Sequence, residues 1–183
     1  GAPDARRLGG APAGVQRRRG AAPEQVAAGE HRLARREDRL QSLMEELQQF
    51  GATDSSYLVA DLDDTAGLAQ AVSGCDAQIL INNTGGPPAG KLIDARPDEL
   101  AQAFQRHVLG AQVLLQAVVP AMQRAGYGRI INVLSTSVRE PIPNLGVSNT
   151  IRGAMASWAK SVSKELVPGI TINNLNNTSS FIF

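Results

Sequence analysis

The sequence predicts an α/β fold built around a doubly wound parallel sheet. From Arg35 onward, short apolar segments typical of strands alternate with longer amphipathic segments typical of helices. Strands separated by helices of about ten or more residues favour parallel pairing, with helices on the faces of the sheet. Polar and glycine residues follow several of these strands, at the edge where ligands bind in such sheets.

The expected elements follow in chain order. Helices are predicted over residues 37–49, 65–72, 98–124 and 148–166, and strands over residues 56–60, 77–81, 129–134 and 170–175. The first helix is indicated by Leu40, Leu43, Met44 and Leu47, which recur at the spacing of one helical face. Pro120 is expected to kink the third helix or to end it early.

Length and composition narrow the class of protein. The chain has 183 residues, of which 43% are hydrophobic and 19% charged, as expected for one globular domain. No apolar run approaches the roughly 20 residues of a transmembrane helix, so no membrane partner is expected. The single cysteine, Cys75, excludes a disulfide framework, and two histidines argue against a zinc site. The arginine-rich start lacks the apolar region of a signal peptide, and a cytoplasmic location is therefore expected.

Residues 1–34 differ in composition from the rest of the chain. Ala, Gly, Arg and Pro fill 24 of these 34 positions, and we expect no buried strand there and a domain boundary after residue 34. Residues 1–39 carry nine arginines against five acidic residues, whereas the remainder has a net charge of −3. Such a basic arm is typical of nucleic-acid binding, but this one has no aromatic side chain to stack on a base. No nucleic-acid partner is therefore expected.

Four landmarks follow one another along residues 35–175. They are Asp61-Leu62, Asn82-Asn83-Thr84-Gly85, the segment from Gly128 to Val133, and Ile170-Thr171-Ile172-Asn173. In this order and spacing they resemble the short-chain dehydrogenase/reductase family, and most of all its bacterial 3-oxoacyl-acyl-carrier-protein reductases. The resemblance implies a Rossmann-like fold and an oxidoreductase that uses NADP or NAD to act on a small carbonyl or alcohol substrate.

The same resemblance implies a cofactor site. Asp61 and Leu62 correspond to the family's contact with the adenine ring, and Asn82, Asn83, Thr84 and Gly85 to the run that lines the cofactor. Arg35 and Arg36 follow the place where the family's second strand ends, where a basic residue implies NADP through its 2′-phosphate. Alternatively, the two arginines are ordinary charges at the entry to a helix.

The expected catalytic set departs from the family's Ser-Tyr-Lys and helical Asn. Its serine corresponds to Ser135, but the tyrosine, lysine and asparagine positions hold Ser148, Arg152 and His107. A serine hydroxyl is shorter than a tyrosine phenol and far less acidic, so the proton donor is left open. His107 can supply a proton near neutral pH, or it is a buried helix residue. Residues 135–143, together with Ser148 and Arg152, resemble a bacterial subgroup, which indicates that the departure is native.

Two parts of the family pattern have no counterpart. No apolar strand with a glycine-rich turn is recognised before Arg35, so the predicted fold is incomplete at its N-terminal glycine-rich turn. The sequence stops before the family's substrate-covering segment, so the predicted fold is also truncated at the C-terminus. Reading the codons of residues 15–20 one base later permits Ser-Ser-Gly-Gly-Val-Gly, which is close to the family's phosphate-binding turn. Residues 1–34 are therefore either a frameshifted nucleotide-binding segment or a native low-complexity arm. The coding DNA distinguishes the two.

Two functions remain open at this point. The first is an NAD(P)-dependent oxidoreductase resembling 3-oxoacyl reductases, and the second is a non-catalytic pseudoenzyme or oligomerising binding module derived from the family. The resemblance also implies a homo-dimer or tetramer formed through helices 98–124 and 148–166. Trp158 either anchors that interface or packs in the core.

Overall fold

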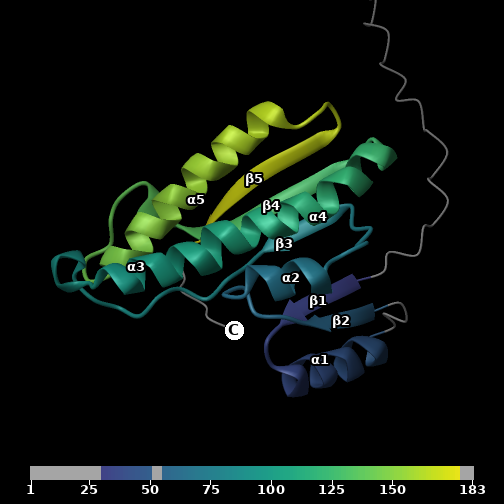
Figure 1. The fold of residues 1–183 in the computed structure, drawn as a ribbon, viewed down its shortest axis with the longest axis horizontal. Coiled ribbons are helices and arrows are strands. Elements are labelled where there is room, and N and C mark those ends of the chain that lie inside the picture. Colours follow the sequence, from purple (N-terminus) through teal and green to yellow (C-terminus); the bar gives the residue numbers. More distant parts are fainter. Residues whose placement is uncertain (1–29, 51–54, 178–183) are drawn as a thin grey trace, which may run out of the picture.

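The computed structural model describes residues 30–50 and 55–177, in which five parallel strands form two sheets (Figure 1). β1 (Glu30–Ala34) pairs with β2 (Ser55–Val59). β3 (Ile79–Asn82), β4 (Gly128–Ser135) and β5 (Ile170–Asn177) form the second sheet in that order. Every pair of neighbouring strands is parallel, so the predicted α/β class with parallel pairing is confirmed.

The helices lie close to their predicted positions. They are α1 (Glu37–Gln49), α2 (Thr65–Ala71), α3 (Pro97–Phe104), a π-helical segment (Gln105–Leu109), α4 (Gly110–Ala125) and α5 (Gly146–Glu165). α3, the π segment and α4 form one continuous helical stretch in place of the predicted helix 98–124. Among the helices that the structure describes, none has both the length and the apolar character needed to cross a bilayer.

Pro120 does not end the third helical stretch, and that part of the prediction is wrong. α4 contains Pro120 and continues to Ala125. Proline removes one backbone hydrogen bond, but Pro120 lies on the exposed side, where water can serve the freed carbonyl. Val118 and Met122, on either side of it, are buried. Their packing holds the helix together through the proline.

β1 lies inside residues 1–34, the segment in which no buried strand was expected. His31 and Arg32 are exposed, and Leu33 and Ala34 are half-buried, so the strand presents no buried face. The strand is held by parallel pairing with β2, which continues where the amide of Ala60 donates to the carbonyl of Ala34 over 3.1 Å. A sequence pattern that depends on burial gives no signal for such a strand.

The main core lies between the second sheet and the helices α4 and α5. Its central cluster contains buried side chains from all of these elements except β3: Leu115, Val118, Met122, Ile130, Val162 and Ile170. Trp158 is partly buried against this cluster and a neighbouring one, and its indole Nε1 donates to Gln112 Oε1 over 2.8 Å. Trp158 therefore packs in the core, as the second of its two interpretations predicts.

Two glycines of α5 are expected to respond oppositely to alanine. A Cβ at Gly146 would clash with the backbone of Leu92, whereas a Cβ at Gly153 would meet nothing within 4 Å. Gly146→Ala should therefore lower the free energy of unfolding by about 2 kcal/mol. Gly153→Ala should raise it by roughly 0.5 to 1 kcal/mol, because it restricts the unfolded chain. Urea unfolding of both variants checks this pair, and equal effects would contradict it.

Candidate cofactor and active site

The candidate residues lie beyond the carboxyl ends of three strands. Asp61 follows β2, Thr84 follows the end of β3 at Asn82, and Ser135 ends β4. β3 and β4 end at the same edge of one sheet, where ligands bind in open α/β folds, and β2 belongs to the other sheet. The contacts described below divide the candidates into two clusters.

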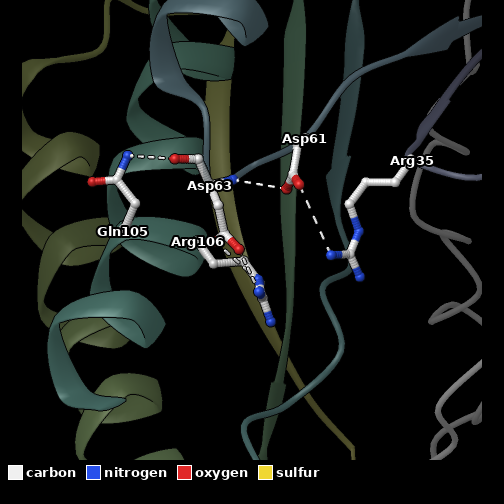
Figure 2. Close-up of polar contacts among 5 residues, drawn as sticks. All are labelled: Arg35, Asp61, Asp63, Gln105 and Arg106. Atoms are coloured by element: carbon white, nitrogen blue, oxygen red, sulfur yellow. Dashed lines mark hydrogen bonds and ion pairs between the residues drawn. The ribbon is translucent and has the colours of Figure 1, made fainter. Parts of the chain in front are cut away.

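The first cluster surrounds Asp61 (Figure 2). Arg35, the residue after β1, places its guanidinium 3.9 Å from the Asp61 carboxylate, and both side chains are partly open to solvent. The two residues, with Val59, Ala60, Asp64 and Gly67, line a surface hollow of about 390 Å³. This hollow combines one guanidinium, the carboxylates of Asp61 and Asp64, and the apolar side chains of Val59 and Ala60. Its apolar side chains can contact a flat ring, and Arg35 is the lining residue that can bind an anion.

Arg36, in contrast, is turned to its own helix. Its guanidinium is 2.9 Å from Asp38 in the first turn of α1, and both side chains are largely exposed. The pKa of the Asp38 carboxyl is lowered, chiefly by this hydrogen bond. The structure therefore gives Arg36 the contact expected of a helix-entry charge and brings only Arg35 to the hollow.

Asp63 fixes the segment after Asp61 to the π segment (Figure 2). The Arg106 guanidinium donates to both carboxylate oxygens of Asp63, and Gln105 donates to the Asp63 backbone carbonyl over 3.3 Å. The amide of Asp63 in turn donates to Asp61 Oδ1 over 3.0 Å. Sequence reasoning did not identify this connection, because Asp63 and Arg106 lie 43 positions apart and nothing local pairs them.

The second cluster is organised by Arg152. Its Nη1 donates to the carbonyl of Val133 in β4, and its Nη2 donates to the carbonyl of Thr84, each over 3.0 Å. Arg152 thus ties the carboxyl ends of β3 and β4 to α5. A Cβ placed on Gly86 would lie 3.8 Å from Ser148 Oγ and 3.9 Å from Arg152 Nη2. The glycine therefore leaves room beside both side chains.

His107 belongs to the same cluster and is contributed by the π segment. It is 4% exposed, and its ring is close to the backbone of Gly85. Burial, first of all, and then the charges of Arg152 and Arg106 lower the pKa of His107 to about 4. The imidazole is consequently neutral at pH 7, and it supports the backbone of Gly85.

A ladder of three asparagine side chains crosses the sheet β3–β4–β5 near the carboxyl ends of β3 and β4. Asn82 Nδ2 donates to Asn132 Oδ1 over 2.8 Å, and Asn132 Nδ2 donates to Asn174 Oδ1 over 2.9 Å. Asn132 is fully buried and Asn82 nearly so. The ladder joins β3, β4 and β5 at one level, so Asn82 fixes the start of the Asn82–Gly85 run by its bond across the sheet.

The remaining predicted site residues are Ser135, Leu62 and Asn83, and each has a local contact or is exposed. Ser135 Oγ accepts a hydrogen bond from the amide of Ser137 over 3.1 Å, which holds the hydroxyl at the end of β4. Leu62 packs against Gly110 at the start of α4, because a Cβ on that glycine would lie 3.4 Å from Leu62. Asn83 is exposed. The structure therefore groups His107, Ser148 and Arg152 around Thr84–Gly86, and separates them from Arg35 and Asp61.

The chain matches a known protein family over most of its length. The family profile described as short chain dehydrogenase matches residues 19–179, which is most of the chain. The chain belongs to the short-chain dehydrogenase family. The matched region extends into the segment before residue 35, where β1 lies.

This chain matches only part of the length of each similar protein. An uncharacterized oxidoreductase of Mycobacterium tuberculosis is 29% identical over 146 residues, which are 76% of this chain and 55% of the relative. Dehydrogenase/reductase SDR family member 4 of Sus scrofa is 32% identical over 99 residues, 53% of this chain and 36% of the relative. The L-sorbose reductase of Gluconobacter frateurii, solved with NADPH and L-sorbose, has the same fold. Its TM-score is 0.76 at 23% identity, over 82% of this chain and 60% of that one. The chain thus spans about half the length of such proteins.

Proposed function

We propose that the chain is the core of an NAD(P)-dependent oxidoreductase that interconverts a carbonyl and a secondary alcohol. The observation that carries the proposal is the Arg152 contact with Thr84 and Val133, which brings Arg152, next to Gly86 and near Ser148, to the carboxyl ends of β3 and β4. Membership in the short-chain dehydrogenase family supports it. A bound nicotinamide would supply or accept the hydride.

The described residues fit a dinucleotide at two places. The hollow beside Arg35 and Asp61 suits an adenine ring, and the guanidinium of Arg35 suits the 2′-phosphate of NADP because such pairs are charge-assisted. Arg152 uses one N–H of each terminal nitrogen on backbone carbonyls, which leaves further N–H groups for ribose hydroxyls. Gly85 has open space where a side chain would stand, so the backbone can approach a ligand closely.

Ser135 and Ser148 would orient the substrate. Each presents a hydroxyl that can donate to a carbonyl oxygen at the end of the sheet, and neither is acidic enough to be the main proton source at neutral pH. His107 does not fit that role either, because it is buried and neutral. A 3-oxoacyl thioester is the substrate class proposed from the family resemblance.

Cofactor binding tests the proposal directly. Titration with NADPH should raise the thermal midpoint and change the fluorescence of Trp158, with about 2.7 kcal/mol of added stability at 100 times the Kd. Arg152→Met should abolish this change in thermal midpoint and fluorescence. The control is Arg139→Met, which replaces an exposed arginine and should leave both responses unchanged. A folded protein that binds neither NADPH nor NADH would contradict the proposal and favour the non-catalytic alternative.

The choice between NADP and NAD has its own matched pair. Arg35→Ala should weaken NADPH binding at least about tenfold and leave NADH binding unchanged, because one charge-assisted contact is lost. Arg36→Ala should change neither, since Arg36 is paired with Asp38. Association into a homo-dimer or tetramer through the helices, and a cytoplasmic location, also stay proposals.

A further inference from the structure

The hollow beside Arg35 is built by one continuous part of the chain. Its lining residues come from the ends of β1 and β2, from the turn that follows β2, and from the first turn of α2. The turn is closed by its own hydrogen bonds, since the amide of Asp64 donates to the carbonyl of Asp61 over 3.1 Å and the amide of Asp63 donates to Asp61 Oδ1 over 3.0 Å. The hollow therefore keeps its shape through contacts within this part, which we call the β1–β2 unit (residues 30–50 and 55–71).

Asp63 connects the β1–β2 unit to the long helical stretch. It is not among the residues that line the hollow. Its carboxylate instead accepts two hydrogen bonds from the Arg106 guanidinium, and its carbonyl accepts one from Gln105 (Figure 2). The side chains of Arg106 and Asp63 are only 27% and 24% exposed. Water and salt therefore screen this pair less than the exposed ion pairs on the surface.

The π segment contacts both candidate clusters. Gln105 and Arg106 hold Asp63, while the ring of the next residue, His107, lies close to the backbone of Gly85. Among the described residues, no strand hydrogen bond joins the β1–β2 unit to the sheet β3–β4–β5. Apolar packing between the two parts is not directional, whereas a two-bond contact between a guanidinium and a carboxylate fixes both distance and direction. The Arg106–Asp63 contact thus sets where the hollow lies relative to the second cluster.

We propose that Arg106 is a positioning residue for dinucleotide binding. Through Asp63 it keeps the hollow beside Arg35 within reach of a dinucleotide that also contacts Arg152. Arg106 itself does not line the hollow, and its guanidinium is occupied by Asp63. This inference rests on the proposed function. A ligand that binds at two places gains affinity from the second place only as far as the protein holds the two in the matching arrangement.

Arg106→Met separates this role from local support of the hollow. NADPH and NADH binding should each weaken at least about tenfold, because both ligands span the two places. Binding of adenosine 2′,5′-bisphosphate, which carries only the adenine end of NADP, should change by less than about twofold, because the hollow keeps its own hydrogen bonds. A merely structural role would lower the stability of the protein and leave all three affinities of the folded protein unchanged. Isothermal titration calorimetry measures the three affinities.

Two further variants serve as controls. Arg96 forms the same kind of two-bond contact with Asp98, over 3.0 and 2.9 Å, but both side chains are exposed and the pair lies at the start of α3. Arg96→Met should therefore leave all three affinities unchanged. The double variant Asp63→Asn/Arg106→Met leaves no unpaired carboxylate at position 63, which protects the fold. It should lose the same affinity for NADPH as Arg106→Met alone.

Spin-label distance measurements test the same role without any ligand. In a Cys75→Ser background, labels on Gln48→Cys in α1 and Lys160→Cys in α5 report the separation of the β1–β2 unit from α5, and both positions are exposed. The distribution of distances should be broader in the Arg106→Met protein, because the directional contact is lost. Arg96→Met should not broaden it.

The outcomes distinguish this inference from the proposed function. A folded Arg106→Met protein that binds NADPH as tightly as the unchanged protein overturns the inference alone. Equal losses for NADPH and for adenosine 2′,5′-bisphosphate also overturn it, because Arg106 would then support the hollow itself. A distance distribution that Arg106→Met leaves unchanged contradicts the inference without reference to any ligand. An unchanged protein that binds neither NADPH nor NADH contradicts the proposed function, and the inference fails with it.

Discussion

Asn132→Ala is expected to lower the free energy of unfolding by about 3 kcal/mol. Asn132 is fully buried and is the middle member of the asparagine ladder, so the change removes two hydrogen bonds at once. It also leaves the buried amide nitrogen of Asn82 without its acceptor. An unsatisfied buried donor costs more than the loss of an exposed one, which can turn to water.

The matched control for this prediction is Asn173→Ala. Asn173 is the same residue type on β5, but it is exposed, and its replacement should change stability by no more than about 0.5 kcal/mol. Urea unfolding followed by circular dichroism measures both variants. Similar values for the two would show that the ladder does not stabilise the sheet.

Stability is expected to fall as the pH is lowered from about 6.5 to about 4, with His107 contributing about 3 kcal/mol of the loss. The pKa of His107 is near 4 in the folded protein, chiefly because of burial, and 6.5 in the unfolded chain. Between these values the unfolded chain binds the proton that the folded protein excludes. The contribution of His107 is therefore fully present above pH 6.5 and lost as the pH falls.

His107→Gln isolates this contribution, because glutamine is polar but does not titrate. The difference in unfolding free energy between the two proteins should change across the window from pH 6.5 to pH 4 and be constant above it. Carboxylates titrate in both proteins, and their effect cancels in the difference. Two stability curves that stay parallel from pH 7 to pH 4 would contradict the burial of a neutral imidazole at this position.

Several features of the fold could be predicted from the sequence because burial leaves a periodic trace. The α1 helix has the predicted bounds, and its buried residues Leu40 and Met44 belong to the predicted apolar face. β4 alternates buried and half-buried residues along its whole length, which gave a strand prediction short by one residue at each end. Where packing follows the period of the element, the pattern is sufficient.

Other features depend on contacts between distant positions and leave no local trace. β1 is half-exposed and exists through its pairing with β2, and the Arg106–Asp63 pair joins residues 43 positions apart. The π segment begins at Gln105 without any residue that would mark it in sequence. For the site, Arg152 and Ser148 were predicted from the family resemblance and stay predictions, whereas the burial of His107 depends on neighbours that are distant in sequence.

The separation into two sheets bears on how a dinucleotide would act on the fold. Arg35 and Asp61 belong to the sheet β1–β2, whereas Arg152 and Thr84 belong with the sheet β3–β4–β5. Among the described residues, no strand hydrogen bond joins the two sheets, and the segment after β2 is linked to the long helical stretch by the Asp63–Arg106 pair and by the packing of Leu62 against Gly110. A ligand that contacted both Arg35 and Arg152 would therefore also connect the two sheets. Binding of such a ligand would stabilise one arrangement of the two sheets, and a more rigid arrangement would in turn bind the ligand more tightly.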